Sequence, residues 1–244
     1  MSPDLFYSAA SDRVARHRAK RASPVEVTRA CLARIDALNL RLNAFCRVDQ
    51  SGALHAAQES EARWMRGTPQ GLLDGVPVSI KDLILTSGLP TLRGSRTIDA
   101  NQPWDQDAPA TARLREHGAI ILGKTSTPEF GWKAVTDGPL TGITRNPWNP
   151  AKTPGGSSGG AAAAVATGMG ALAVGTDGGG SIRIPAAFTG VFGMKPSFGR
   201  VPPWPLSLFC TVSHCGPRTR AGDDAAVVAN GTCEPDPPGL VCPA

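Results

Sequence analysis

The sequence predicts an α/β fold in which helices alternate with short, buried strands. Hydrophobic residues make up 41% of the 244 residues and charged residues 18%, a balance typical of a globular chain with one sizeable core or two small ones. Helix-like stretches are followed by short apolar runs at several points along the chain. The 28 glycines and 22 prolines follow no repeat, which excludes collagen and favours an enzyme rich in loops.

The N-terminal part is expected to be mainly helical. Ser23-Pro24-Val25-Glu26 has the features of a helix start: a capping serine, a proline in the first turn and a glutamate after it. Apolar residues then recur at helical spacing as far as Ile35, residues 42–48 are compatible with a strand, and residues 52–66 again predict a helix. Basic residues gather between residues 13 and 21. Since no aromatic residues interleave with them, a solvated helix face is favoured over a nucleic-acid-binding arm.

Two apolar runs predict buried strands that end next to a lysine. Val76-Pro77-Val78-Ser79-Ile80 leads into Lys81-Asp82, and Ala119-Ile120-Ile121-Leu122 leads into Gly123-Lys124. Strands without polar alternation are usually buried on both faces of a sheet. The same order continues elsewhere, with helices expected over residues 107–117 and 161–167 and a strand over residues 171–174.

Two glycine-rich loops each present serine side chains. Residues 155–160 contain Ser157 and Ser158, and residues 175–181 end in Ser181, which follows three consecutive glycines. Loops of this kind either bind phosphate or form an oxyanion hole with backbone N–H groups. Because neither loop is followed by the lysine of a phosphate-binding loop, the oxyanion hole is favoured. Its expected donors are the amides of Gly178, Gly179, Gly180 and Ser181.

A rival motif would make Ser158 the nucleophile. Gly156-x-Ser158-x-Gly160 matches the nucleophile elbow of α/β-hydrolases, which needs an apolar strand before it and a histidine base after it. Residues 146–154 are polar and rich in proline, so they predict a loop instead. A match to dinucleotide-binding glycines at residues 168–173 follows a helix rather than a strand. Only His214 follows the elbow motif, whereas the other histidines lie in charged helical stretches and are expected to face solvent: His17, His55 and His117.

Lys81 is the other candidate base. At the end of an apolar strand, burial would lower its pKa and leave a neutral amine that can accept a proton from a serine hydroxyl. A surface lysine paired with Asp82 fits the strand position equally well, so the residues alone leave both interpretations open. Asp177 and Arg183 flank the Ser181 loop with opposite charges, and we expect them to form an ion pair that keeps the loop rigid.

At this point several stretches resemble one known family. The motif Gly75-Val76-Pro77-Val78-Ser79-Ile80-Lys81-Asp82, both glycine loops and Gly216-Pro217-Arg218-Thr219-Arg220 are similar to the amidase signature family of amide hydrolases. The likeness runs from about Leu72 to about Val228. With the glycine loops included, the stretches that match between these two motifs are, in the expected order, residues 123–125, 144–148, 154–160, 175–185 and 193–196.

The resemblance implies a fold and a set of roles. The fold would be the family's twisted mixed β-sheet flanked by helices. Ser181 would be the nucleophile, Ser157 the bridging serine that follows a cis peptide bond, and Lys81 the base, with Ser158, Asp177 and Arg183 supporting the site. The reaction would hydrolyse a small-molecule carboxylic acid amide through an acyl-enzyme on Ser181. Neither a metal nor an organic cofactor is expected.

The resemblance also suggests boundaries. Residues 1–71 would be an N-terminal helical segment of the same domain, residues 72–228 the catalytic core and residues 229–244 a divergent tail rich in proline and cysteine. Members of the family are usually much longer, so the fold is expected to be incomplete. A truncated or frameshifted gene is favoured over a split enzyme completed by a partner and over a shortened variant. Two single residues also depart from the family pattern. Gly178 stands where a larger residue is frequent in the family, and Arg218 stands where an apolar residue is common.

Two alternatives to a general amidase stay open. One is the A-type component of a tRNA-dependent amidotransferase, which releases ammonia from glutamine, although residues 125–132 look more like general amidases. The other is an inactive remnant. The expected partners are the amide substrate and either a second copy or a complementing chain, without nucleic acid or membrane. The six cysteines form no C-x-x-C pair, and the start of the chain does not have the basic-then-apolar pattern of a secretory leader, so free thiols in the cytoplasm are expected.

Overall fold

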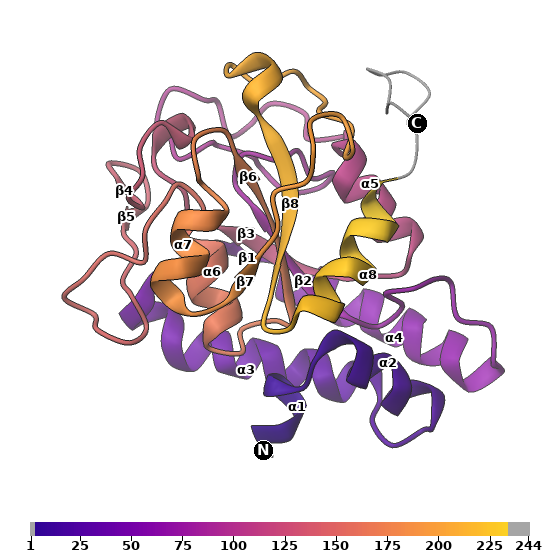
Figure 1. Ribbon diagram of the computed structural model, residues 1–244. Coiled ribbons are helices and arrows are strands. Elements are labelled where there is room, and N and C mark those ends of the chain that lie inside the picture. Colours follow the sequence, from indigo (N-terminus) through magenta and orange to yellow (C-terminus); the bar gives the residue numbers. More distant parts are fainter. Residues whose placement is uncertain (1–2, 234–244) are drawn as a thin grey trace.

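The computed structural model describes residues 3–233 and shows a six-stranded mixed sheet covered by helices on both faces, together with a separate antiparallel pair of short strands, β4 (Asp137–Gly138) and β5 (Gly142–Ile143) (Figure 1). The strands of the six-stranded sheet are β1 (Phe45–Val48), β2 (Pro77–Lys81), β3 (Ile120–Thr125), β6 (Leu172–Asp177), β7 (Phe192–Gly193) and β8 (His214–Thr219). The helices are α1 (Pro3–Tyr7), α2 (Ala10–Arg18), α3 (Pro24–Leu42), α4 (Gln50–Arg66), α5 (Pro109–Glu116), α6 (Gly159–Ala166), α7 (Arg183–Thr189) and α8 (Gly222–Thr232), with short 3-10 turns η1 (Glu129–Gly131) and η2 (Cys210–Val212).

Six strands form the main sheet in the order β1-β3-β2-β6-β8-β7. The central strands β3, β2 and β6 run parallel, whereas β1, β8 and β7 pair antiparallel to their neighbours. One apolar core packs α5 and α8 against one face of the sheet, and a second packs α3, α4 and α6 against the other (Figure 1). The predicted α/β fold with a mixed sheet flanked by helices is therefore confirmed.

Local sequence signals explain where α3 begins and ends. The Ser23 hydroxyl accepts from the Glu26 amide at 3.0 Å, and the Glu26 carboxylate accepts from the Ser23 amide at 2.9 Å, which is a capping box. The helix ends at Leu42, after which Asn43 adopts a left-handed conformation with φ 52°. The strand expected over residues 42–48 is therefore confined to β1. Among residues 3–233, no helix is both long and apolar enough to cross a membrane.

Two predicted strands are longer than expected. β3 continues through Gly123 and Lys124 to Thr125, and β6 continues through the first three residues of the second glycine loop to Asp177. β6 extends because β8 supplies a partner strand that sequence patterning did not reveal, with Gly175 opposite Gly216 and Asp177 opposite His214. This pairing fixes the base of the loop that carries Ser181.

His17 does not face solvent, contrary to expectation. It is a buried residue of α2, its Nδ1 lies 2.9 Å from the Ala22 carbonyl, and its ring centroid lies 6.0 Å from that of Trp64 on α4. His117 is half-buried, and only His55 of these three is exposed. A helix of charged residues can still bury its one imidazole when the ring finds a backbone carbonyl.

The expected boundaries fall inside continuous structure. β1 joins the main sheet, so residues 3–71 contribute a strand to this sheet as well as helices. At the other end, α8 continues to Thr232, past the expected limit at residue 228. Most of the predicted tail, residues 234–244, lies outside the described residues.

Candidate active site

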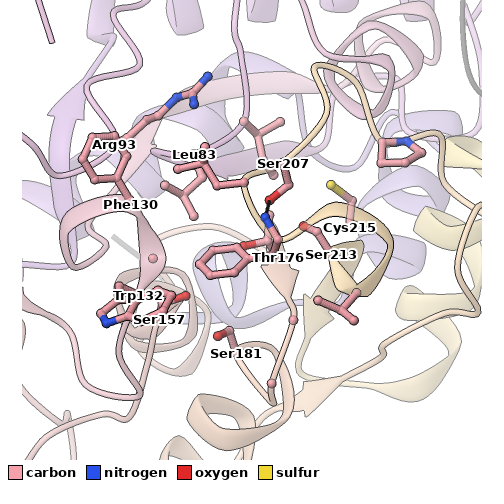
Figure 2. Close-up of a pocket in the computed structure, with 18 of the residues that line it drawn as sticks. Leu83, Arg93, Phe130, Trp132, Ser157, Thr176, Ser181, Ser207, Ser213 and Cys215 are labelled. Carbon is pink, nitrogen blue, oxygen red and sulfur yellow. Dashed lines mark hydrogen bonds between the residues drawn. The ribbon is translucent and has the colours of Figure 1, made fainter.

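Lys81, Ser157 and Ser181 come together at one edge of the sheet. β2 and β6 are neighbouring parallel strands, so Lys81 at the end of β2 lies beside the loop that follows β6 and carries Ser181. Ser157 lies in the loop that leads into α6. Figure 2 shows Ser157, Thr176 and Ser181 around the same cavity. The structure thus brings together the three residues that the sequence singled out.

The Lys81 amine is held by two hydroxyl groups. Its Nζ lies 2.6 Å from Ser157 Oγ and 2.8 Å from Thr176 Oγ1, and the side chain is fully buried (0% exposed). Asp82, its partner in the surface interpretation, is itself buried and accepts a hydrogen bond from the Gly94 amide instead. The structure therefore favours a buried base over a surface ion pair.

Burial shifts the protonation equilibrium of Lys81 towards the neutral amine. It lowers the pKa of the amine well below its usual value, because a charged ammonium loses its hydration there. The positive charge of Arg218 lowers this pKa further, whereas the nearby Cys215 and Asp177 oppose the shift. A neutral amine within hydrogen-bond distance of Ser157 can accept its proton.

The two serines of the first loop have different surroundings. The peptide bond between Gly156 and Ser157 is cis, as the family resemblance implied, and a Cβ on Gly156 would lie 2.5 Å from the Val135 carbonyl oxygen. Ser157 points to Lys81, whereas the Ser158 hydroxyl donates to the Thr176 carbonyl at 3.1 Å. Ser158 is therefore engaged with Thr176 at the end of β6, the same threonine whose hydroxyl binds Lys81.

Asp177 organises the loop that presents Ser181. Its carboxylate accepts from the amides of Gly180 at 2.7 Å and Ile182 at 3.0 Å and forms an ion pair with Arg183 at 2.9 Å, which confirms the expected pairing. Burial alone would raise the pKa of Asp177, but the hydrogen bonds from the Arg183 side chain and the loop amides outweigh it and hold the pKa well below the usual range.

The Asp177 contacts revise the expected oxyanion hole. The Gly180 amide already donates to Asp177, so it is not free to bind a developing oxyanion. Gly178, Gly179 and Ser181 line the cavity, whereas Gly180 does not. Gly180 therefore drops out of the expected donors, and the amides of Gly178, Gly179 and Ser181 remain the expected ones.

The described contacts of His214 do not include Ser158, the serine that a nucleophile elbow would use. Its Nδ1 lies 2.8 Å from the Val212 carbonyl and 3.1 Å from the Asp177 carbonyl, and its ring packs edge-on against Phe198. The segment before the elbow motif, residues 146–154, contains turns and no strand. These contacts leave Lys81 as the base nearest to the serines of the first loop.

The cavity beside the serines has a volume of about 370 Å³ and largely apolar walls (Figure 2). Trp132 stacks on Phe209 with ring centroids 5.8 Å apart, and Phe130 and Leu83 contribute to the same walls. Residues 202–209 form another side, a segment that sequence analysis assigned no role. Its three prolines, at residues 202, 203 and 205, together with the apolar Trp204, Leu206 and Leu208, indicate an irregular apolar segment.

Two further residues of the site were missed from sequence. Thr176 immediately precedes Asp177 and binds Lys81, but a threonine at the end of a strand carries no distinctive pattern. Arg218 on β8 donates from Nη2 to the Ser181 carbonyl at 2.8 Å. A charged residue in a strand position where apolar residues are common was the available signal. Within residues 3–233, no group of three or more His, Cys, Asp or Glu side chains is arranged to hold a metal ion.

Comparisons with known proteins agree with this geometry. The sequence profile of the family described as Amidase matches residues 26–242. The A-type component of the glutamyl-tRNA(Gln) amidotransferase from Solidesulfovibrio magneticus is 42% identical over 239 residues, which cover 98% of this chain and 48% of that protein. The chain thus spans about half the length of the curated relatives it matches.

Solved structures match over nearly the whole chain. A bacterial aryl acylamidase of the amidase signature enzymes aligns with a TM-score of 0.89 at 35% identity, covering 98% of this chain and 50% of that one. A protein from a vestigial complex that reveals the evolutionary origins of an s-triazine catabolic enzyme aligns with a TM-score of 0.90 at 32% identity, covering 97% and 52%. With the profile match and this common fold, the chain belongs to the amidase signature family.

Proposed function

We propose that this chain carries the catalytic centre of an amidase that hydrolyses a carboxylic acid amide to the acid and ammonia or an amine. The observation that carries the proposal is the contact between the fully buried Lys81 amine and Ser157 Oγ at 2.6 Å, at the cavity that also holds Ser181. A buried neutral amine next to a serine is a base for proton relay. Membership of the family supports the same chemistry.

The proposed reaction uses the three side chains in sequence. Neutral Lys81 takes the Ser157 proton, Ser157 takes the proton of Ser181, and Ser181 Oγ attacks the amide carbon. The amides of Gly178, Gly179 and Ser181 stabilise the oxyanion, and Ser157 returns a proton to the leaving nitrogen. Water then hydrolyses the acyl-enzyme on Ser181, with the relay accepting its proton.

The cavity walls favour an amide with an apolar or aromatic acyl group. None of the described residues that line the cavity is Asp or Glu, and its charged lining residues, Arg93 and Lys133, are cations. Free glutamine carries an ammonium group that a buried site must pair with an acceptor of opposite charge. The stacked pair of Trp132 and Phe209 offers instead a flat surface for an apolar group.

The amidotransferase remains the second candidate, because the curated relatives named above are components of that kind of enzyme. To separate the two, ammonia release from benzamide, phenylacetamide and L-glutamine should be measured with the wild-type chain and with Ser181→Ala. An amidase should favour the aromatic amides over glutamine by at least about tenfold in kcat/KM. A preference for glutamine would instead support the amidotransferase.

A complementing chain is the partner we propose. The wall formed by residues 202–209 includes apolar side chains that are largely exposed, with Leu208 at 73% and Leu206 at 55%. One aligned structure also comes from a protein complex. The cytoplasm is the proposed location, because Cys31, Cys46 and Cys215 are free thiols.

A further inference from the structure

Arg218 is a fully buried cation, and among the described residues no carboxylate accepts a hydrogen bond from it. It lies on β8, and its Nη2 donates to the Ser181 carbonyl at 2.8 Å. Among the described residues, its Nε and Nη1 find no hydrogen-bond partner. Burying a guanidinium with unpaired N–H groups opposes folding, so a role in stability alone would be better served by an apolar side chain.

The neighbouring strand is shaped to accept this guanidinium. Arg218 stands opposite Ala173 on β6, and its side chain reaches along the sheet across Gly175. A Cβ at Gly175 would overlap Nη1, so glycine is required for Arg218 to lie there. The next residue, Thr176, binds the Lys81 amine, and the carbonyl that Arg218 holds belongs to Ser181. The guanidinium therefore lies next to the residue before Thr176, which binds the base Lys81, and also contacts the main chain of the nucleophile Ser181.

We propose that Arg218 is a positioning residue of the amide-cleaving site, which fixes the main chain of Ser181 and places a positive charge near Lys81. This inference rests on the proposed function of Ser181 and Lys81. The task assigned to Arg218 is to keep Lys81 neutral. A protonated Lys81 would be a second positive charge in the same buried space, and repulsion between like charges disfavours this form.

The charges around Lys81 are consistent with this task. After burial, Arg218 is the largest cause that lowers the pKa of Lys81. Burial lowers the pKa of Arg218 only to about 9, so the guanidinium stays charged at neutral pH. Asp177 on β6 and the Cys215 thiol on β8 act in the opposite direction. The other groups close by are already engaged: Arg183 on α7 with Asp177, and Lys124 on β3 with Ile84, Thr86 and Thr91.

The titration of Lys81 tests the charge effect without requiring catalysis. The protein, labelled with ¹³C at the lysine Cε, should be followed by NMR from pH 5 to 11, with Lys81→Met identifying the signal. Arg218→Met and Arg218→Gln should both raise the midpoint of Lys81, because both remove the positive charge. Arg218→Lys, which keeps a charge, should leave the midpoint close to that of the wild type. An unchanged midpoint in both neutral variants overturns the proposal, and Arg218→Gln decides the matter if Arg218→Met does not fold.

A second readout separates positioning from a merely structural effect. The rate of phosphonylation by a fluorophosphonate should be measured across the same pH range. In Arg218→Met the acidic limb should move to higher pH, with about a tenfold lower rate at pH 7 for each pH unit moved and recovery at high pH. A loss that is equal at all pH values contradicts the charge effect. If the Lys81 midpoint moves as expected and no variant reacts, the failure belongs to the proposed function of Ser181.

Discussion

At the scale of single residues, Lys81 and Lys124 are a matched pair with different surroundings. Both are fully buried, and they lie on the neighbouring strands β2 and β3. The Lys124 amine donates to the Ile84 carbonyl and to the hydroxyls of Thr86 and Thr91, which ties down the segment after β2. Burial lowers the pKa of Lys124 to about 8, opposed by Asp82, whereas Lys81 is held by hydroxyls alone and faces Arg218. The difference in partners predicts a difference in function.

The substitutions Lys81→Met and Lys124→Met should therefore separate chemistry from stability. Lys81→Met removes the proton acceptor and should slow phosphonylation of Ser181 by about 100-fold or more. Lys124→Met leaves buried acceptors without a donor and should lower the free energy of unfolding by about 1–3 kcal/mol. Rates measured at pH 8, together with urea denaturation, check both. A Lys81→Met protein that reacts at the wild-type rate would rule out Lys81 as the base.

At the scale of elements, the sequence predicts the features that depend on residues close together along the chain. The capping box of α3, the apolar strands β2 and β3 and the glycine loops were all predictable for this reason. The pairing of β6 with β8 brings together residues about 40 positions apart, so no local pattern revealed the longer β6 or the contact between Arg218 and Ser181. The use of the Gly180 amide by Asp177 likewise required the folded loop.

The Ser181 loop should be sensitive to acid through Asp177. Its folded pKa is lowered, so the stability that this carboxylate contributes is complete above its unfolded pKa, near 4, and is lost as the pH falls further. Asp177→Asn should therefore lower the free energy of unfolding at pH 7, by at least about 1 kcal/mol, because charge-assisted bonds are lost. Denaturation at pH 7 and pH 3 measures the difference from wild type, which should shrink at pH 3. A difference that is equal at both values would contradict this role.

At the scale of the whole molecule, one end of the sheet presents apolar side chains to solvent. β7 is an edge strand, Phe192 on it is 44% exposed and Phe188 on the adjoining α7 is 53% exposed. Trp148 lies close to this edge, because its indole N–H donates a hydrogen bond to the carbonyl of Thr189, the last residue of α7. Its side chain is 73% exposed. Edge strands next to exposed aromatic residues promote association between chains. The site itself, by contrast, lies among strands that are paired on both sides.

Self-association of the chain should accordingly depend on this edge. Phe188→Glu combined with Phe192→Lys should decrease association at concentrations where the wild type associates, as measured by sedimentation velocity and light scattering. Tyr7→Glu, at a comparably exposed aromatic residue (43%) on α1, is the matched control and should change little. Equal association in all three proteins would show that another surface is responsible.

The most direct test of the catalytic centre is to find where a fluorophosphonate attaches. The wild-type chain should be phosphonylated once, and peptide mass spectrometry should place the adduct on Ser181. Ser181→Ala should not react, whereas in Ser158→Ala the adduct should still form on Ser181, since Ser158 is bound to the Thr176 carbonyl. An adduct on Ser158, or full labelling of Ser181→Ala, would contradict the assignment of Ser181 as the nucleophile.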